Sequence, residues 1–288
     1  MTMQILRRID EPRALARTCK SRGERVALVP TMGYLHEGHL SLVRIARQHA
    51  DRVVVSLFVN PTQFGPGEDL DRYPRDFERD RALCEEAGVD ALFVPEAANM
   101  YPQGFSTSVD VHGTLTKGLC GASRPGHFAG VATVVTKLFN LCDPDVAVFG
   151  QKDAQQAAVI RRFTEDLNLA VEIVVAPIVR EADGLAMSSR NVYLTQDERA
   201  QAIVLKKSLG AAVALFDRGE RNSAAIINEA EDIVASAPLA RISYVEIVDA
   251  RTLAPVDVIE RPALLALAVY FGKTRLIDNT LLPPTGVL

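Results

Sequence analysis

Short apolar runs alternate with stretches of helical periodicity over the first 175 residues. Runs of four to seven apolar residues are typical of strands buried on both faces of a parallel sheet. Recurrence of apolar residues every three or four positions is typical of helices. The predicted strands are 26–29, 53–59, 91–94, 146–149 and 171–175, with 107–111 as a further candidate. The predicted helices are 11–22, one that includes 40–46, 75–87, one that runs from the loop 123–128 to residue 141, and 154–166.

The pattern changes after about residue 190. A capping box, Thr195 with Glu198, predicts the start of a long helix that runs to about residue 217, and Ser223 is the predicted cap of a second helix that runs to about residue 237. Predicted strands follow at 242–248, 264–271 and 274–279.

Together the two patterns predict an α/β protein, a Rossmann-like doubly wound parallel sheet with a smaller C-terminal α+β domain. We expect the first domain to cover residues 1–185 and to bind nucleotide and substrate, and residues 186–288 to form a lid domain.

Composition excludes several classes of protein. The chain has 288 residues, of which 48% are hydrophobic and 24% charged, and its net charge is −4. An acidic chain without a basic stretch is not expected to bind nucleic acid. No window approaches the ~18 apolar residues of a membrane span, and the N-terminus lacks an apolar signal core. We therefore expect a cytoplasmic protein whose four cysteines are reduced thiols.

The stretch VALVPTMGYLHEGHL, residues 26–40, combines a strand, a tight turn and a helix start. Pro30 is expected to end the strand, because it has no N–H to donate. A helix N-terminus at the carboxyl edge of a parallel sheet is a predicted anion site. His36 and His39 lie three residues apart, so they would share one face of the first helical turn. An isolated histidine here would more often be a surface residue, but the pair and its flanking glycines favour a ligand site.

Three further loops follow strands or join the domains. In the loop 60–64 the Gln63 amide has donors and an acceptor that suit a hydroxy acid. The alternative is an ordinary polar loop, because Asn-Pro often starts a turn. In 150–153 Lys152 can neutralise phosphate, and Asp153 can accept from ribose or simply cap a helix. Residues 180–194 are a mobile phosphate-binding loop or an interdomain linker.

Two tempting motifs are rejected. Gly272-Lys273-Thr274 ends like a P-loop, but it joins two strands and is predicted to be a hairpin turn. The pair Gly65 and Gly67 has Leu70 where a dinucleotide fingerprint needs its third glycine.

The HEGH sequence at 36–39 resembles the HIGH signature of the nucleotidyltransferase superfamily. The wider set PTMGYLHEGHL, FVNPTQF, YPRD, SRPGHF, FGQKD and DGLAMSSRNVYL resembles the pantothenate synthetase (pantoate–β-alanine ligase) family over residues 26–194. The resemblance implies a ligase that uses ATP, with Mg²⁺, to join (R)-pantoate to β-alanine through a pantoyl-adenylate. AMP and diphosphate are released, and members resemble one another in being cytoplasmic homodimers.

The resemblance also implies roles for individual residues. The implied catalytic residues are His39, His36, Lys152, Ser188, Ser189 and Arg190. The implied ATP-binding residues are Met32, Gly33, Tyr34, Leu35, His36, Glu37, Gly38, His39, Gly150, Gln151, Lys152, Asp153, Val179, Met187, Ser188, Ser189 and Arg190. Gln63 and Gln156 would bind pantoate, and Gln63 would also contact β-alanine. No metal ligand is assigned.

Two rival functions stay open on the sequence. One is a nucleotidyltransferase that releases its adenylylated product, and the other is a nucleotide-binding sensor that has lost catalysis. The paired glutamines and the second domain argue against the first. The intact set of His36, His39, Lys152 and 188–190 argues against the second.

Overall fold

The structure, a computed structural model, describes residues 2–284. The chain divides into two compact units. Within the described residues the first unit comprises 2–111, 124–150 and 159–176, and the second comprises 112–123, 151–158 and 177–284. The predicted boundary after residue 185 and the lid role of 186–288 stay predictions; the last change of unit along the chain is at Pro177.

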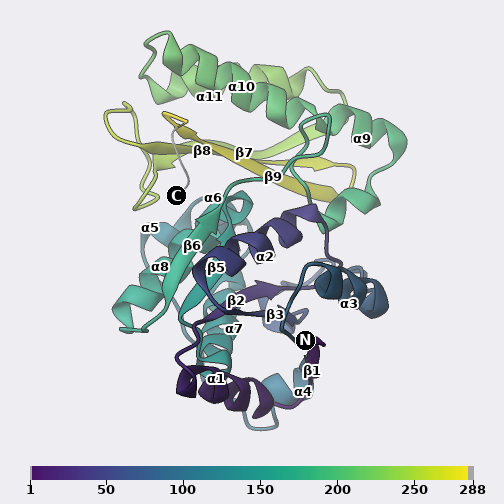
Figure 1. The fold of residues 1–288 in the computed structure, drawn as a ribbon. Helices are drawn as coiled ribbons and strands as arrows, with labels where there is room; N and C mark the ends of the chain where they lie inside the picture. The colour runs from purple at the N-terminus through teal and green to yellow at the C-terminus, as the bar shows by residue number, and fades with distance from the viewer. Residues whose placement is uncertain (1, 285–288) are drawn as a thin grey trace. The chain divides into compact units, whose positions relative to one another are not determined.

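The first unit is built on a six-stranded parallel sheet (Figure 1). Its strands are β1 (Gln4–Leu6), β2 (Val26–Thr31), β3 (Arg52–Leu57), β4 (Ala91–Phe93), β5 (Val146–Gly150) and β6 (Glu172–Ala176). They are ordered β1-β4-β3-β2-β5-β6, so the direction of winding reverses between β2 and β5. The crevice beyond the carboxyl ends of strands at such a reversal is where ligands bind in doubly wound sheets.

Helices cover both faces of this sheet, as the doubly wound prediction requires. The helices named in this region are α1 (Glu11–Ser21), α2 (Glu37–His49), α3 (Phe77–Glu86), α4 (Ala97–Met100), α7 (His127–Cys142) and α8 (Ala154–Asp166). Alternate residues of β2 point to opposite faces. Ala27 and Val29 pack with Leu42 and Val43 of α2, while α1 and α7 contact β2 and each other.

The second unit contains a three-stranded antiparallel sheet in the order β7-β8-β9, which run Ala240–Asp249, Ala263–Phe271 and Thr274–Leu282. Its helices are α5 (Thr114–Lys117), α6 (Leu119–Ser123), α9 (Gln196–Ala202), α10 (Val204–Asp217) and α11 (Ser223–Ala235). One apolar cluster joins α10 and α11 to the sheet and includes Leu205, Ile226 and Leu265. The predicted α/β class with a smaller α+β part is confirmed.

Several sequence predictions of element bounds are wrong. Pro30 does not end β2, which continues to Thr31. The carbonyl of Thr31 accepts from Phe58 N–H on the β3 side, so Pro30 faces the β5 side, where pairing stops at Leu28. The missing N–H therefore costs no ladder bond there.

Other differences have equally local reasons. Residues 107–111 form no strand, and Val109 N–H instead donates to the Thr133 hydroxyl, at 2.9 Å. The predicted helix to residue 217 is divided at Ile203 into α9 and α10, and Asn222 rather than Ser223 caps α11. Strand β1 was not predicted, because three residues are too few to show a period.

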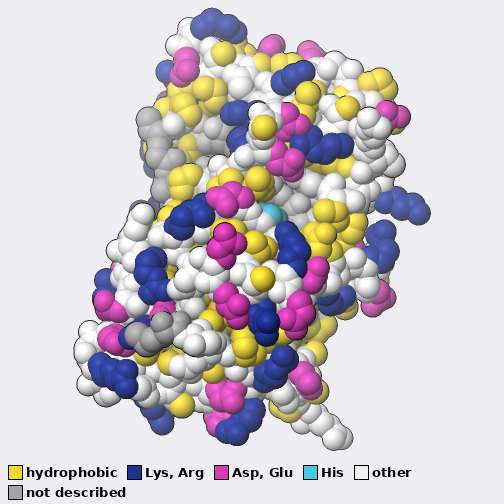
Figure 2. Space-filling view, turned by 45° about the vertical axis from the view of Figure 1, so that its right-hand side comes forward, with side chains coloured by type: hydrophobic (Ala, Val, Ile, Leu, Met, Phe, Trp, Pro, Cys, Tyr) yellow, Lys and Arg dark blue, Asp and Glu magenta, His cyan; other side chains and the backbone are white. Residues whose placement is uncertain are grey.

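Charged side chains of both signs are intermixed on the face seen in Figure 2. Within residues 2–284, every helix falls short of the length and apolar content that crossing a bilayer would need. All four cysteines are unpaired and buried. Burial raises the pKa of both Cys84 and Cys142 to about 12, so neither thiol is an activated nucleophile.

Candidate active site

The turn between β2 and α2, residues 32–36, is the first part of the predicted site. We call it the β2–α2 turn. Gly33 and Tyr34 both adopt left-handed backbone, with φ of 84° and 49°. Asp80 of α3 accepts from the two amides that follow: Tyr34 N–H donates to Oδ2 and Leu35 N–H to Oδ1, each at 2.7 Å. The sequence reading missed Asp80, which lies 45 positions beyond the turn it holds.

The two predicted histidines lie side by side at the start of α2. Their ring centroids are 4.0 Å apart. Gly38 N–H donates to His36 Nδ1 at 3.1 Å, and His36 N–H donates to His39 Nδ1 at 3.3 Å. A neutral imidazole that accepts at Nδ1 carries its hydrogen on Nε2. The backbone therefore selects the tautomer in which each Nε2 is a donor.

These contacts bear on the predicted anion site, which stays a prediction. The anion site was expected from the N–H groups at the start of this helix, but the ring and the carbonyl of His36 accept from the N–H groups of Gly38 and His39. The histidine Nε2–H donors are therefore further candidates for contact with an anion at this helix start.

The loop after β3, residues 60–64, is the second part, and we call it the amide loop. Pro61–Gln63 is one 3₁₀ turn capped by Asn60, so the Asn-Pro pair starts an ordered turn. Asn60 Oδ1 accepts from Thr62 N–H, and Asn60 Nδ2 donates to the Gly130 carbonyl at 3.1 Å. A backbone donor on one side and a backbone acceptor on the other fix which way this amide points.

The orientation of Gln63 follows from that of Asn60. Asn60 Nδ2 also donates to Gln63 Oε1 at 3.1 Å, so the Gln63 amide nitrogen lies on the other side, 3.1 Å from Met32 Sδ. Gln63 is buried, with 8% of its surface exposed. The amide is therefore oriented with its N–H donors away from Asn60.

The SRPGHF segment, to which the sequence assigned no role, supports the amide loop. His127 Nδ1 lies 2.8 Å from the Gln63 carbonyl, and Arg124 Nη2 donates to the same oxygen at 3.4 Å. Arg124 is held by a bidentate pair with Glu68. Burial acts to raise the pKa of the Glu68 carboxyl, but the pair with Arg124 and further contacts outweigh it, so that the pKa is lowered. At Gly130 a Cβ would lie 2.4 Å from the Thr62 carbonyl oxygen, so only glycine allows this approach.

In the second unit, residues 151–153 form a 3₁₀ turn that leads into α8. Asn279 of β9 donates from Nδ2 to the carbonyls of Gln151 and Lys152, each at 3.0 Å. The Lys152 side chain is 21% exposed and its Nζ lies 3.9 Å from Asp153 Oδ2. Gln156 is partly exposed, whereas the neighbouring Gln155 is buried and bonds to backbone.

The loop 180–194 is more firmly held than its composition predicted. Leu185 is 1% exposed and lies in the apolar cluster of the second unit, so apolar packing anchors the loop at this residue. Arg180 pairs with Asp278 at 2.6 and 2.9 Å. Ser188 Oγ accepts from Arg190 N–H at 3.3 Å and caps the turn Ser189–Tyr193, while Met187 N–H donates to the Val179 carbonyl at 3.0 Å.

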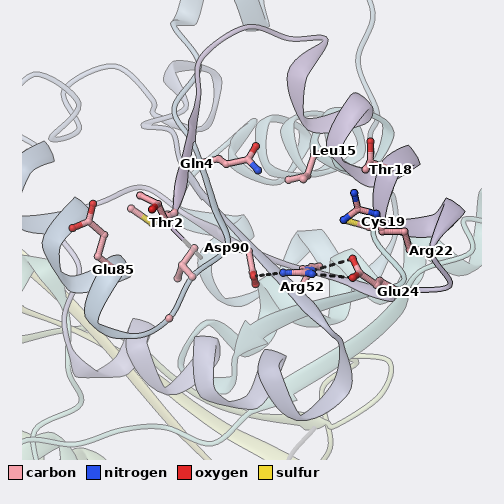
Figure 3. A pocket seen from close by; sticks show the side chains of 13 residues that line it. Thr2, Gln4, Leu15, Thr18, Cys19, Arg22, Glu24, Arg52, Glu85 and Asp90 are labelled. Carbon is pink, nitrogen blue, oxygen red and sulfur yellow. Dashed lines mark hydrogen bonds and ion pairs between the residues drawn. The ribbon is translucent and has the colours of Figure 1, made fainter.

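A cavity of about 620 Å³ lies in the first unit near the amino ends of β1 and β3 (Figure 3). Arg52 bridges Glu24 and Asp90 across its wall, donating to Glu24 at 2.8 and 3.0 Å and to Asp90 at 3.1 Å. None of the predicted site residues lines it, and the strands that carry the predicted loops end at the opposite edge of the sheet.

Comparison with known proteins agrees with the motifs. The model of the family described as pantoate-beta-alanine ligase matches residues 4–281. Pantothenate synthetase of Pelotomaculum thermopropionicum is 57% identical over 280 residues, 97% of this chain and 99% of the relative. That of Heliobacterium modesticaldum is 59% identical over 277 residues, 96% of this chain and 98% of the relative.

Solved structures give the same result. The crystal structure of pantothenate synthetase from Thermus thermophilus superposes with a TM-score of 0.91 at 49% identity, covering 96% of this chain and 98% of that one. Pantoate-beta-alanine ligase from Francisella tularensis, complexed with Beta-gamma ATP and β-alanine, gives 0.78 at 32% identity, with 99% of both chains covered. The resemblance read from the motifs is confirmed, and with it the ligase class. The chain belongs to the pantoate-beta-alanine ligase family.

Proposed function

We propose that the chain catalyses ATP-dependent ligation of (R)-pantoate and β-alanine to pantothenate through a pantoyl-adenylate, releasing AMP and diphosphate. The observation that carries the proposal is the family match over residues 4–281, which spans every motif of the predicted site. The Francisella relative with Beta-gamma ATP and β-alanine supports the choice of substrates.

The first step joins a carboxylate oxygen of pantoate to the α-phosphorus of ATP and breaks the bond to diphosphate. Two anions must approach, and negative charge builds on the departing diphosphate, so positioned donors carry most of the catalysis. His36 and His39, with their hydrogens on Nε2, are suited to donate to phosphate oxygens. His39 is the principal catalytic histidine in this proposal.

Gln63 holds pantoate through an N–H of its amide, because its Oε1 already accepts from Asn60 and the amide nitrogen already donates once to Met32 Sδ. An oriented donor selects an oxygen acceptor such as a carboxylate or hydroxyl of the hydroxy acid. Gln156, partly exposed on the first turn of α8, is the second pantoate residue.

Gly150, at the end of a first-unit segment, and residues of the second unit bind the nucleotide in this proposal. Lys152 neutralises phosphate charge, and Gly150, Gln151 and Asp153 bind ribose and phosphate. Val179 contacts adenine through its backbone. Met187, Ser188, Ser189 and Arg190 contact the phosphates, where two hydroxyls and a fixed positive charge suit anionic oxygens.

The second step joins the β-alanine nitrogen to the acyl carbon and expels AMP, while the amine loses a proton. AMP is a good leaving group, so the step needs no nucleophile from the protein. The buried thiols with raised pKa fit that scheme.

Mg²⁺ enters bound to ATP in this proposal. Among residues 2–284, no group of three or more carboxylate, histidine or cysteine side chains is placed to hold a metal ion. Mg²⁺ in nucleotide enzymes is held mainly by phosphates and waters, with only one or two carboxylates. A cytoplasmic homodimer is the proposed state of the protein.

ATP–diphosphate exchange tests the proposal. Exchange that requires pantoate, and AMP release that requires β-alanine, are the expected results. Adenylylated product released without an amine would favour a plain nucleotidyltransferase. Nucleotide binding without exchange would favour a sensor.

A further inference from the structure

We propose that Asp80 is a positioning residue that sets the β2–α2 turn for nucleotide binding. Its side chain comes from α3 and is almost fully buried, with 2% of the residue exposed. Each carboxylate oxygen accepts from one of two consecutive amides, those of Tyr34 and Leu35, at 2.7 Å. These are the short distances of hydrogen bonds to a charged acceptor.

The backbone of the turn explains why a carboxylate is needed. Gly33 and Tyr34 are both left-handed, and tyrosine adopts that conformation only at an energetic cost. Successive amides in such a turn point to one side and form a concave site for an anion. Asp80 supplies that anion from within the protein, so it holds a conformation that the turn would otherwise leave.

Gly33 also packs closely against the Asp80 carboxylate. A Cβ on Gly33 would lie 3.1 Å from Asp80 Oδ2, tighter than ordinary contact. The other charged groups near the carboxylate are Arg79, whose Nη1 lies 3.6 Å from Oδ1, and Asp76. The Arg79 guanidinium also lies over the Tyr34 ring, 4.9 Å from its centroid, so it contacts both partners of the clamp.

The electrostatics argue for a role beyond stability. Burial is the main cause that raises the pKa of Asp80, which means that ionising it is less favourable inside the fold than in water. The amides and Arg79 oppose that shift without cancelling it. The β2–α2 turn leads directly into His36 and His39. A buried Asp80 carboxylate beside this turn, kept although burial disfavours its charge, indicates that it serves the geometry of the turn.

This inference rests on the proposed function, in which the turn and its histidines bind ATP. Asp80 acts on ATP only through the backbone of the turn. Loss of the clamp should therefore weaken nucleotide binding far more than pantoate binding. The proposed pantoate residue Gln63 is oriented by Asn60 of the amide loop, and it contacts the turn through its bond to Met32 Sδ.

The test compares Asp80→Asn with Asp76→Asn by calorimetric titration of a non-hydrolysable ATP analogue and, separately, of pantoate. Asparagine keeps the shape of the side chain but turns an NH₂ toward one of the two N–H groups. We expect Asp80→Asn to weaken binding of the ATP analogue about 10- to 100-fold, the range for a lost hydrogen bond to a charged group. Pantoate affinity should stay within about twofold, and so should both affinities of Asp76→Asn, because asparagine caps helices as well as aspartate does.

Gly33→Ala provides a second route to the same result if Asp80→Asn does not fold. Gly33→Ala keeps the Asp80 carboxylate and displaces the turn, so we expect the same selective loss of affinity for the ATP analogue. Unchanged affinity for the analogue, or equal losses for both ligands, would overturn the proposal. Wild-type exchange that depends on pantoate is measured first, so a failure of the proposed function is distinguished from a failure of Asp80.

Discussion

The β2–α2 turn and the amide loop follow neighbouring strands of one sheet, yet opposite chemistry holds them. A buried carboxylate holds the first, through two amides of a left-handed turn. Neutral groups do most of the holding in the second: the Asn60 amide, the Tyr101 hydroxyl, which donates to Asn60 Oδ1 at 2.7 Å, and backbone at Gly130. Arg124 adds a charged donor to this loop, which reaches the Gln63 carbonyl at 3.4 Å. A single charge makes a strong but pH-sensitive clamp, whereas a neutral network divides the work among several weaker bonds.

The largest effect is expected in the β2–α2 turn and its helix, on removal of His39. His39→Ala should slow adenylate formation by about 10²- to 10³-fold, the usual cost of losing one donor to a developing negative charge. Pantoate-dependent ATP–diphosphate exchange measures it. His49→Ala, at the other end of α2 and on the surface, is the control and should retain near wild-type exchange. An active His39→Ala enzyme would remove this histidine from the mechanism.

Gly130→Ala tests how tightly the amide loop is packed. The new Cβ would lie 2.4 Å from the Thr62 carbonyl oxygen and 2.7 Å from Gln63 N, so backbone must move. We expect a loss of about 1–3 kcal/mol in the free energy of unfolding, typical of overpacking, together with weaker pantoate binding. Chemical denaturation and pantoate titration measure the two effects.

The matched control is Gly210→Ala in α10, where a Cβ would meet nothing within 4 Å. There the better helix propensity of alanine should stabilise the protein by about 0.5–1 kcal/mol. If both variants changed stability in the same direction, close packing at Gly130 would not be the reason for its glycine.

Tyr101→Phe should have a smaller effect, because it removes one hydroxyl, which contacts Asn60 Oδ1 and Thr62 Oγ1, and keeps the rest of the network. The ring contacts with Phe58 and Phe105 are retained, while Asn60 Oδ1 still accepts from Thr62. The loss of a neutral hydrogen bond is worth about 0.5–1.5 kcal/mol, so pantoate affinity should fall by roughly 2- to 12-fold. Titration with pantoate and with an ATP analogue measures the difference, and a loss confined to ATP would contradict the division between the two loops.

The smallest expected effect is on the pH dependence of stability, which distinguishes the charged Asp80 clamp from the hydrogen-bond network of the amide loop. Because the pKa of Asp80 is raised in the fold, the folded protein takes up this proton at a higher pH than the unfolded chain does. Wild-type stability should therefore fall, relative to Asp80→Asn, as pH rises from the ordinary aspartate pKa through the raised one. Tyr101→Phe should show no such trend in the same range. Thermal unfolding of the three proteins across that range measures it, and parallel curves for wild type and Asp80→Asn would contradict the charged clamp.

Local sequence was sufficient for most elements and for the identity of the motif loops. Apolar runs located five of the six parallel strands, since strands buried on both faces need only their own residues to be recognised. The Thr195–Glu198 capping box was likewise confirmed, because its partners lie three residues apart. The HEGH spacing brought His36 and His39 together for the same reason.

Only the tertiary structure decided what holds those loops in place. Asp80, Arg124 and His127 lie about 45 to 64 positions from the groups they bind, and nothing in the local pattern ties them to those groups. Pro30 is tolerated within β2 because pairing with β5 stops at Leu28. The donor face of Gln63 is set by partners of Asn60 from two segments of the chain. Periodicity and spacing reveal which residues share an element, but the direction of a hydrogen bond and the burial of a charge depend on what the fold brings beside them.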